Sequence, residues 1–231
     1  MLTKKGFFIT GTNTGIGKTV ISAILVNKFN GIYWKPIQCG SDENNLTDSD
    51  IVSKILEKDR NTLVHPERFV LKEPLSPNIA ANKQKIKIKL NDFDIEKLPK
   101  DKTIIIEGAG GLMVPINSDE MIIDLLIKFN LPVVLVASTK LGTINHTLLS
   151  LNLIKNKFKN KTYIIFFGKE NLETVKTIDH FRKKIIGKNA KILNFIPKEK
   201  KINLDYISFT VNIIYFFIFC IINYYWFILI I

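Results

Sequence analysis

The sequence predicts an α/β protein, a single domain in which a mostly parallel β-sheet is flanked by helices. Short apolar runs alternate along the chain with stretches of helical periodicity, which is typical of buried strands joined by crossover helices. A length of 231 residues suits one such domain and is sufficient for a substantial core. We expect this domain over residues 1–205 and a separate apolar tail over residues 206–231.

Strands are predicted where apolar and β-branched residues run together and end at glycine, proline or polar residues. In chain order these segments are 6–10, 31–34, 102–106, 131–137, 163–167 and 191–195. Ligands of parallel sheets bind beyond the carboxyl ends of the strands. The loops that follow these strands are therefore the expected location of a functional site.

Helices are predicted where apolar residues recur at helical spacing between the strands. In chain order these segments are 18–29, 49–57, 119–129, 143–158 and 170–184. Asp48 or Ser49 is expected to cap the second helix. The segment 60–90 holds several prolines and is expected to be irregular.

The formal net charge is +12, which nucleic acid, a membrane surface or anionic small molecules could each explain. Lys, Ile, Asn and Phe are frequent throughout, as expected if the coding DNA is rich in A and T. Lysines scattered for that reason need no partner. They are not grouped with aromatic residues as a nucleic-acid platform requires, so we expect no nucleic-acid partner.

Cysteine usage and the N-terminus indicate a cytoplasmic protein. Cys39 and Cys220 are the two cysteines, and no Cys/His spacing typical of zinc occurs. Neither zinc nor a disulfide framework is predicted, which fits a reducing cytosol. The apolar run after Lys4 and Lys5 is short and continues into a glycine-rich loop, so no signal peptide is predicted.

The tail over 209–231 carries no charge and is long enough to span a bilayer as a helix. Lys198, Lys200 and Lys201 precede it, as on the cytoplasmic side of a membrane anchor. Its many β-branched and aromatic residues favour a helix only weakly. An AT-rich stretch read in the wrong frame would give the same composition, so a membrane anchor and a non-native read-through both remain open.

A glycine-rich loop over 11–19 predicts a polyphosphate site. The usual pattern is G-x-x-x-x-G-K-[ST]; here the first glycine stands one place early, at Gly11, while Gly17, Lys18 and Thr19 fit. The loop leaves a predicted strand and enters a helix, so backbone N–H groups face an anion. Lys18 can reach the β- and γ-phosphates, and the Thr19 hydroxyl can bind Mg²⁺.

A magnesium site needs further oxygen ligands. Glu107 ends a predicted buried strand in the position of the second acid of phosphate-loop proteins, and the glycines after it leave space for a ligand. Asp48 and Asp50 offer another carboxylate, although either is also suited to cap the helix that begins there.

Six motifs together resemble the dethiobiotin synthetase family over roughly residues 4–200. They are GTNTGIGKT in the loop, KPIQCGS at 35–41, SDI at 49–51, EPLSPNIAA at 73–81, EGAGGLMVPI at 107–116 and KLGTINHTLLS at 140–150. The loop pattern also occurs in related ATPases, whereas the set in this order and spacing is highly specific. The implied fold is that of phosphate-loop NTPases.

The resemblance implies an ATP- and Mg²⁺-dependent ligase of biotin biosynthesis, which converts 7,8-diaminopelargonate and CO2 to dethiobiotin. One amine captures CO2 as a carbamate, whose oxygen attacks the γ-phosphate of ATP. The second amine then closes a cyclic urea, leaving ADP and phosphate. Because carbamate and γ-phosphate are both anions, cations between them and their positioning supply most of the catalysis.

The family's functional residues carry over to named positions of this chain. Those implied in catalysis are Lys18, Lys35 and Thr12. Those implied in nucleotide binding are Gly15, Ile16, Gly17, Lys18, Thr19, Val20, Asp50, Glu107, Gly108, Ala109, Gly110, Phe167, Gly168 and Pro197. The implied metal ligands are Thr19, Asp50 and Glu107. The implied substrate contacts are Cys39, Leu141, Gly142, Thr143 and Asn145, the last four from the partner subunit of a homodimer.

Three positions depart from the family pattern. Cys39 stands where Ser or Thr is usual, and a thiol is a weaker hydrogen-bond donor. Asn78 replaces a common His. Phe167 and Gly168 stand where an Asn usually reads adenine, so base selectivity is in question.

A second function from another class fits the loop alone: a membrane-tethered partitioning or scaffold ATPase of the same superfamily. Such proteins usually carry a second lysine near the start of the loop, and residues 11–13 contain none. KPIQCG and LGTINH have no role under that alternative.

Overall fold

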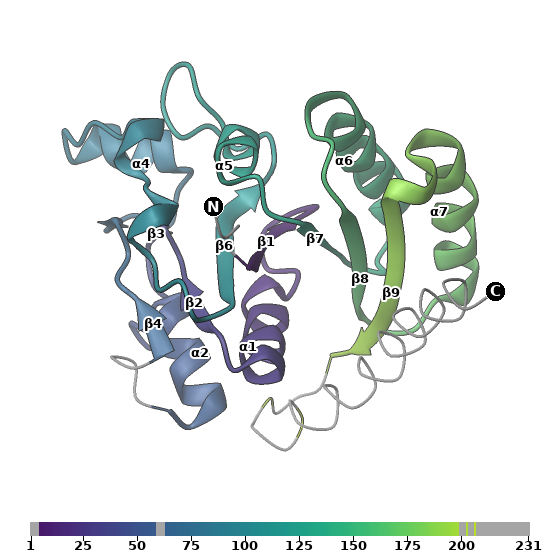
Figure 1. The fold of residues 1–231 in the computed structure, drawn as a ribbon, viewed down its shortest axis with the longest axis horizontal. Coiled ribbons are helices and arrows are strands. Elements are labelled where there is room, and N and C mark those ends of the chain that lie inside the picture. Colours follow the sequence, from purple (N-terminus) through teal and green to yellow (C-terminus); the bar gives the residue numbers. More distant parts are fainter. Residues whose placement is uncertain (1–4, 59–62, 199–201, 203–205, 207–231) are drawn as a thin grey trace.

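The computed structural model describes residues 5–58 and 63–198, together with Ile202 and Tyr206. The main sheet has seven strands in the order β4-β2-β6-β1-β7-β8-β9, and every neighbouring pair is parallel. Figure 1 shows these strands with the helices packed around them. The strands are β1 (Gly6–Gly11), β2 (Ile32–Trp34), β4 (Val64–His65), β6 (Ile104–Gly111), β7 (Val133–Ala137), β8 (Thr162–Gly168) and β9 (Ala190–Pro197). The predicted α/β class with a mostly parallel sheet is confirmed.

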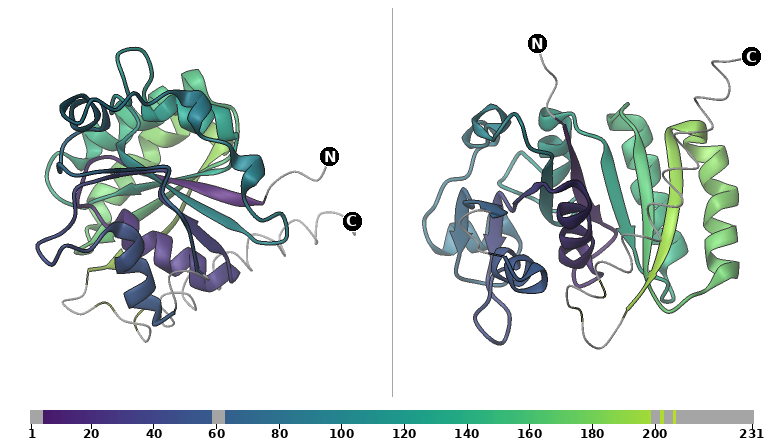
Figure 2. Two further views of the ribbon diagram at one scale, coloured as in Figure 1. Left: turned by 90° about the vertical axis from the view of Figure 1, so that its left-hand side faces the viewer. Right: turned by 60° about the horizontal axis from the view of Figure 1, so that its bottom comes forward.

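Helices cover both faces of this sheet, as Figure 2 shows. The helices are α1 (Lys18–Phe29), α2 (Asp48–Leu56), α4 (Pro77–Lys83), α5 (Ile122–Phe129), α6 (Thr143–Lys157) and α7 (Leu172–Ile185). Helices α1 and α2 share one apolar cluster with Ile9, Tyr33 and Ile105. Helix α5 packs on the other face with Phe8 and Ile106. The core thus lies in two layers on either side of the central strands β1 and β6.

A small second sheet was not predicted. It pairs β3 (Ile37–Cys39) in parallel with β5 (Phe69–Leu71). Strands β4 and β5 and helix α4 give structure to much of the segment 60–90, which was expected to be irregular, and the 3₁₀ turns η1 (Leu90–Asp92) and η2 (Ile95–Lys97) follow it. Prolines there mark the ends of short elements and do not prevent them; Ser76 precedes Pro77, which occupies the first turn of α4 where proline is tolerated.

Helix boundaries differ from prediction where side chains build turns. Helix α5 starts at Ile122 because Asn117 accepts hydrogen bonds from the backbone of Asp119 and Glu120, each at 2.8 Å, and so forms a tight turn. Helix α2 is capped by Thr47, and not by Asp48 or Ser49 as predicted. Asn171 caps α7, which starts at Leu172.

The pairing of β1 and β6 is irregular beside the predicted site. Strands β1 and β6 pair from Gly6 and Ile104 up to Ile9 and Glu107, and their register then shifts so that Gly11 pairs with Gly111. This irregularity lies at the point where the glycine-rich loop begins, and it changes which residues of β6 lie beside the end of β1.

The described part of the chain contains no helix with both the length and the apolarity that crossing a membrane requires. Apart from Tyr206, the predicted tail lies outside the described residues.

Candidate active site

The loop between β1 and α1 has the backbone of a phosphate site. Gly15 and Gly17 have φ angles of 65° and 96°, which residues with side chains rarely adopt. Gly17 is the N-cap of α1 and has no side chain to accept hydrogen bonds from the first turn, so the N–H groups of that turn can face an anion. Lys18 is 7% exposed, and its ammonium group donates to the carbonyl of Asn13 at 3.1 Å, which holds the lysine over the loop.

Two carboxylates and a hydroxyl meet at the end of this loop. The Thr19 hydroxyl lies 3.1 Å from Oδ1 of Asp48 and 3.3 Å from Oε1 of Glu107. Thr19 comes from α1, Asp48 from α2 and Glu107 from β6, so three elements position the cluster. Glu107 is 1% exposed.

Lys35 joins the same cluster from the end of β2. Its ammonium nitrogen lies 2.5 Å from Oδ2 of Asp48 and 3.0 Å from Oε1 of Glu107. A buried ammonium is costly unless it is paired, and here two carboxylates pair with it. The result is a cation fixed beside the phosphate loop.

The surroundings move the pKa values of the two lysines in opposite directions. Burial lowers the pKa of Lys18, and the nearby charge of Lys35 lowers it further, although Glu107 opposes both effects. Burial would also lower the pKa of Lys35, but Glu107 and Asp48 outweigh it and raise that pKa well above its usual range. The pKa of Asp48 is lowered: burial opposes this change, but the charge and hydrogen bond of Lys35 outweigh it.

Asp50, the predicted metal ligand of α2, forms the cap of this helix in the structure, and Asp48 is the acid of α2 that lines the cavity. The Asp50 carboxylate accepts hydrogen bonds from the backbone N–H of Thr47 at 2.9 Å and from the Thr47 hydroxyl at 2.6 Å, which closes a capping box at the start of α2. Residues two apart on a helix point in nearly opposite directions. Asp48 therefore faces Thr19 and Lys35, while Asp50 faces the cap.

One cavity of about 610 Å³ unites these groups. The predicted site residues that line it are Gly15, Gly17, Lys18, Thr19, Lys35, Cys39, Glu107, Ala109 and Gly110. Lys18 and Lys35 thus share one cavity, as a common role in charge neutralisation requires. Its other walls include Thr14, Gln38 and the turn over 74–77.

The oxygen donors in this cavity fit a magnesium ion. Thr19, Asp48 and Glu107 offer a hydroxyl and two carboxylates, the hard ligands that Mg²⁺ prefers. Within the described ranges no three His, Cys, Asp or Glu side chains gather as a metal cluster. A set of two acids suits Mg²⁺, which usually keeps water and phosphate oxygens as further ligands.

Several predicted site residues do not line this cavity and instead pack in the core or bond through their backbone. Ile16 and Val20 pack into the apolar cluster under α1. The backbone N–H of Thr12 donates to Val136 at 3.0 Å. Gly108 is buried against Phe8, where a Cβ atom would lie 3.2 Å from the ring.

Phe167, Gly168 and Pro197 lie on the other side of the loop, at the carboxyl ends of β8 and β9. Phe167 is 6% exposed, and a Cβ atom added to Gly17 would lie 2.3 Å from its ring. The ring therefore packs directly against the loop. Around it, the Thr139 hydroxyl donates to the carbonyl of Lys169 at 2.5 Å.

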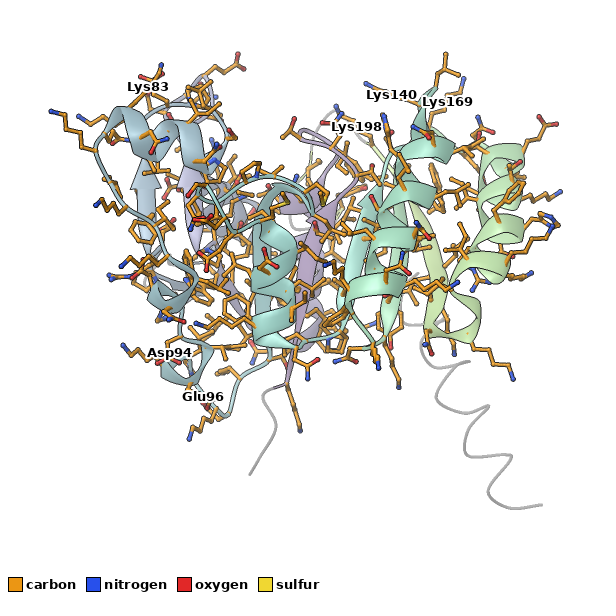
Figure 3. The ribbon with its side chains drawn as sticks, turned by 90° about the horizontal axis from the view of Figure 1, so that it is seen from above. Lys83, Asp94, Glu96, Lys140, Lys169 and Lys198 are labelled. Carbon is orange, nitrogen blue, oxygen red and sulfur yellow. The ribbon has the colours of Figure 1, made fainter. Side chains whose placement is uncertain are left out.

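Three exposed lysines stand on the loops at this end of the sheet. Figure 3 shows the side chains of Lys140, Lys169 and Lys198 along one edge of the molecule. The backbone N–H of Lys198 donates to Gly168 at 3.3 Å, which ties the ends of β8 and β9 together. This side of the phosphate loop offers positive charge around an apolar side chain.

The predicted substrate contacts at the start of α6 do not line the cavity of their own chain. Leu141 is fully exposed, and Gly142 and Asn145 are exposed beside it. Thr143 is buried, and its hydroxyl donates to the carbonyl of Ser138 at 2.6 Å, so this side chain closes the loop before the helix.

Sequence reasoning missed two hydroxyl groups that contact Glu107. Ser22 and Tyr33 each donate to its Oε2 at 2.9 Å. Ser22 follows Thr19 by three residues, which places both on one side of α1. Tyr33 precedes Lys35 by two residues, the spacing of one strand face. Both spacings are visible in the sequence.

Comparisons with known proteins agree with this geometry. A family model described as an AAA domain matches residues 5–204. The ATP-dependent dethiobiotin synthetase BioD of Paramagnetospirillum magneticum is 40% identical over 77% of this chain and 83% of its own length. The protein of the same name from Christiangramia forsetii is 42% identical over 80% of this chain and 86% of its own length.

Among solved structures, a ParA family ATPase from Chlorobium tepidum has a similar fold. The TM-score is 0.55 at 14% identity, covering 90% of this chain and 98% of that one. At this identity the likeness concerns the fold alone. The sequence relatives show that the chain belongs to the family of ATP-dependent dethiobiotin synthetases.

Proposed function

We propose that this protein forms dethiobiotin from 7,8-diaminopelargonate, CO2 and ATP in biotin biosynthesis. The observation that carries the proposal is the shared cavity in which Lys18, from the phosphate loop, and Lys35, from the KPIQCG motif, both stand. A carbamate oxygen and the terminal phosphate of ATP repel each other, and two fixed ammonium groups reduce this repulsion.

The phosphates of ATP bind the loop over 12–17 and the first turn of α1, with Lys18 on the transferring phosphoryl group. The carbamate formed on one amine of the substrate lies beside Lys35. Once its oxygen carries the phosphoryl group, that oxygen becomes a good leaving group. The second amine then attacks the carbonyl carbon, and phosphate leaves as the cyclic urea closes.

Magnesium is part of the proposal. Thr19, Asp48 and Glu107 are the residues that would hold it, because their oxygens converge within hydrogen-bonding distance. The bound ion would supply positive charge to the phosphates. Lys35, which pairs with the same two acids, keeps their negative charge from repelling the anionic carbamate.

The diamine lies on the side of the cavity formed by β3 and the turn over 74–77. Cys39 lines this side, and its thiol is half-buried. We propose that the chain acts as a homodimer in the cytoplasm. The exposed Leu141, Gly142 and Asn145 would then meet the substrate tail in the partner's cavity, since they do not line their own.

The test is phosphate release from ATP by the purified protein. Release should require both diaminopelargonate and bicarbonate, and the organic product should have the mass of dethiobiotin. Lys18→Ala should abolish nucleotide use, because the loop loses the charge that stabilises the transferring phosphoryl group. Turnover that ignores the diamine and rises with DNA or lipid vesicles would instead support a partitioning or scaffold ATPase.

A further inference from the structure

Glu107 has two carboxylate oxygens in different surroundings. Oε2 accepts hydrogen bonds from Ser22 and Tyr33, each at 2.9 Å. Oε1 lies 3.0 Å from the Lys35 ammonium group and 3.3 Å from the Thr19 hydroxyl. One oxygen is thus turned toward the core and the other toward the cavity.

The two hydroxyl donors of Oε2 are rigidly placed. Ser22 and Tyr33 are both 0% exposed, so neither exchanges its bond with bulk water. Ser22 lies on α1, which begins at the phosphate loop, and Tyr33 lies on β2, which pairs with β6 with Tyr33 opposite Ile105. From there the phenol extends along the sheet face toward Glu107, two residues further along β6.

We infer that Ser22 and Tyr33 are positioning residues, whose hydroxyl groups hold Oε2 of Glu107 so that Oε1 is presented to the divalent cation of the site. Without them the carboxylate could rotate about its last torsion, which is intrinsically broad. Groups that orient a metal ligand typically change metal affinity by about 10- to 100-fold when they are removed. The inference rests on the proposed metal role of Glu107.

The experiment measures Mn²⁺ binding by electron paramagnetic resonance, with a non-hydrolysable ATP analogue present and neither diamine nor bicarbonate added. Tyr33→Phe and Ser22→Ala should each raise the dissociation constant for Mn²⁺ by about 10-fold. Both variants keep nearly the same volume in the core, so the fold should persist, and thermal unfolding checks this.

Two matched controls remove a hydroxyl group elsewhere. Tyr163→Phe alters a tyrosine whose ring packs against Phe7 on the same face of the sheet. Ser53→Ala alters a buried serine that donates to the carbonyl of Ser49 at 3.0 Å. Neither should change Mn²⁺ affinity. Equal effects in controls and test variants would overturn the inference.

A double-mutant cycle separates positioning from general packing. In a Glu107→Gln background, which already weakens the metal site, Tyr33→Phe should have little further effect on Mn²⁺ affinity. The same 10-fold loss in both backgrounds would overturn the inference. If Glu107→Gln itself leaves Mn²⁺ affinity unchanged, the metal role of Glu107 is wrong and the inference fails with it. Diamine-dependent product formation, which is assayed separately, is not decided by that result.

Discussion

The two sides of the phosphate loop differ in the kind of side chain that surrounds the loop. On the β2–β6 side, Lys35, Asp48 and Glu107 contact one another through charged groups. On the β8–β9 side, an apolar ring, Phe167, packs against Gly17. The charged cluster and the apolar ring therefore come from separate strands on the two sides of the loop.

The largest effect expected on either side of the loop, apart from the loss of nucleotide use in Lys18→Ala, is that of Lys35→Ala. The variant should lose about 1,000-fold in kcat for dethiobiotin formation, because a fixed cation beside the developing charge is removed. Binding of an ATP analogue should change little, since Lys18 and the loop remain. Lys83→Ala is the control. Lys83 is the last residue of α4, its side chain is exposed, and its ammonium nitrogen lies 3.7 Å from Oε2 of Glu73. Normal product formation by Lys35→Ala would contradict the assigned role.

Gly17→Ala tests the contact between the two sides. The variant should lose about 3 kcal/mol of unfolding free energy, because the new methyl group meets the Phe167 ring and the φ angle is strained. Gly187→Ala is the matched control, with a φ angle of 62° and no atom within 4 Å of an added Cβ. Denaturant unfolding without nucleotide measures both. Equal losses would mean that the ring does not limit the space at Gly17.

Phe167→Asn tests base recognition. Phenylalanine offers no hydrogen bond to a base edge, so the wild-type protein should use GTP nearly as well as ATP. Asparagine at this position should raise the preference for ATP, measured as a ratio of kcat/KM values, by about 10-fold. Phe167→Leu, which keeps the site apolar, should behave as the wild type. Strong ATP preference in the wild-type protein would show that other groups read the base.

The smallest expected effect is that of Cys39→Ser. A hydroxyl is the stronger donor, so KM for the diamine should fall by about 3-fold with kcat unchanged.

Burial raises the pKa of the Cys39 thiol to about 11, although the charge of Lys35 opposes this. The thiol is therefore protonated at neutral pH, and alkylation by iodoacetamide should accelerate only as the pH approaches that value. Rapid alkylation at pH 8 would contradict the burial of this side chain.

Five of the six predicted strands match the structure within two residues, because a buried parallel strand requires an uninterrupted apolar run; β6 continues to Gly111, beyond its predicted end at residue 106. The sequence also predicted Lys18, Thr19, Lys35 and Glu107 in one site, since each follows such a run. The residues alone left the choice between Asp48 and Asp50 open, because both suit the start of a helix, and the family resemblance favoured Asp50. Only the capping box with Thr47 decides which carboxylate turns away from the cavity.

The small sheet of β3 and β5 shows another limit of prediction. Each strand has three residues, so neither gives a clear alternation of apolar and polar side chains. Their pairing joins segments about thirty residues apart, and only the folded chain brings these together. The side of the cavity that we propose for the diamine was therefore inferred from motifs and not from predicted strands.

The opposite pKa changes of the two cavity lysines set an order of deprotonation. In the nucleotide-free protein, rising pH should discharge Lys18 first, because burial lowers its pKa, while the pair of acids keeps Lys35 charged. Rising pH would thus weaken the binding of ATP before it removes the positive charge of Lys35 beside the carbamate. The basic limb of the pH profile should accordingly appear in KM for ATP.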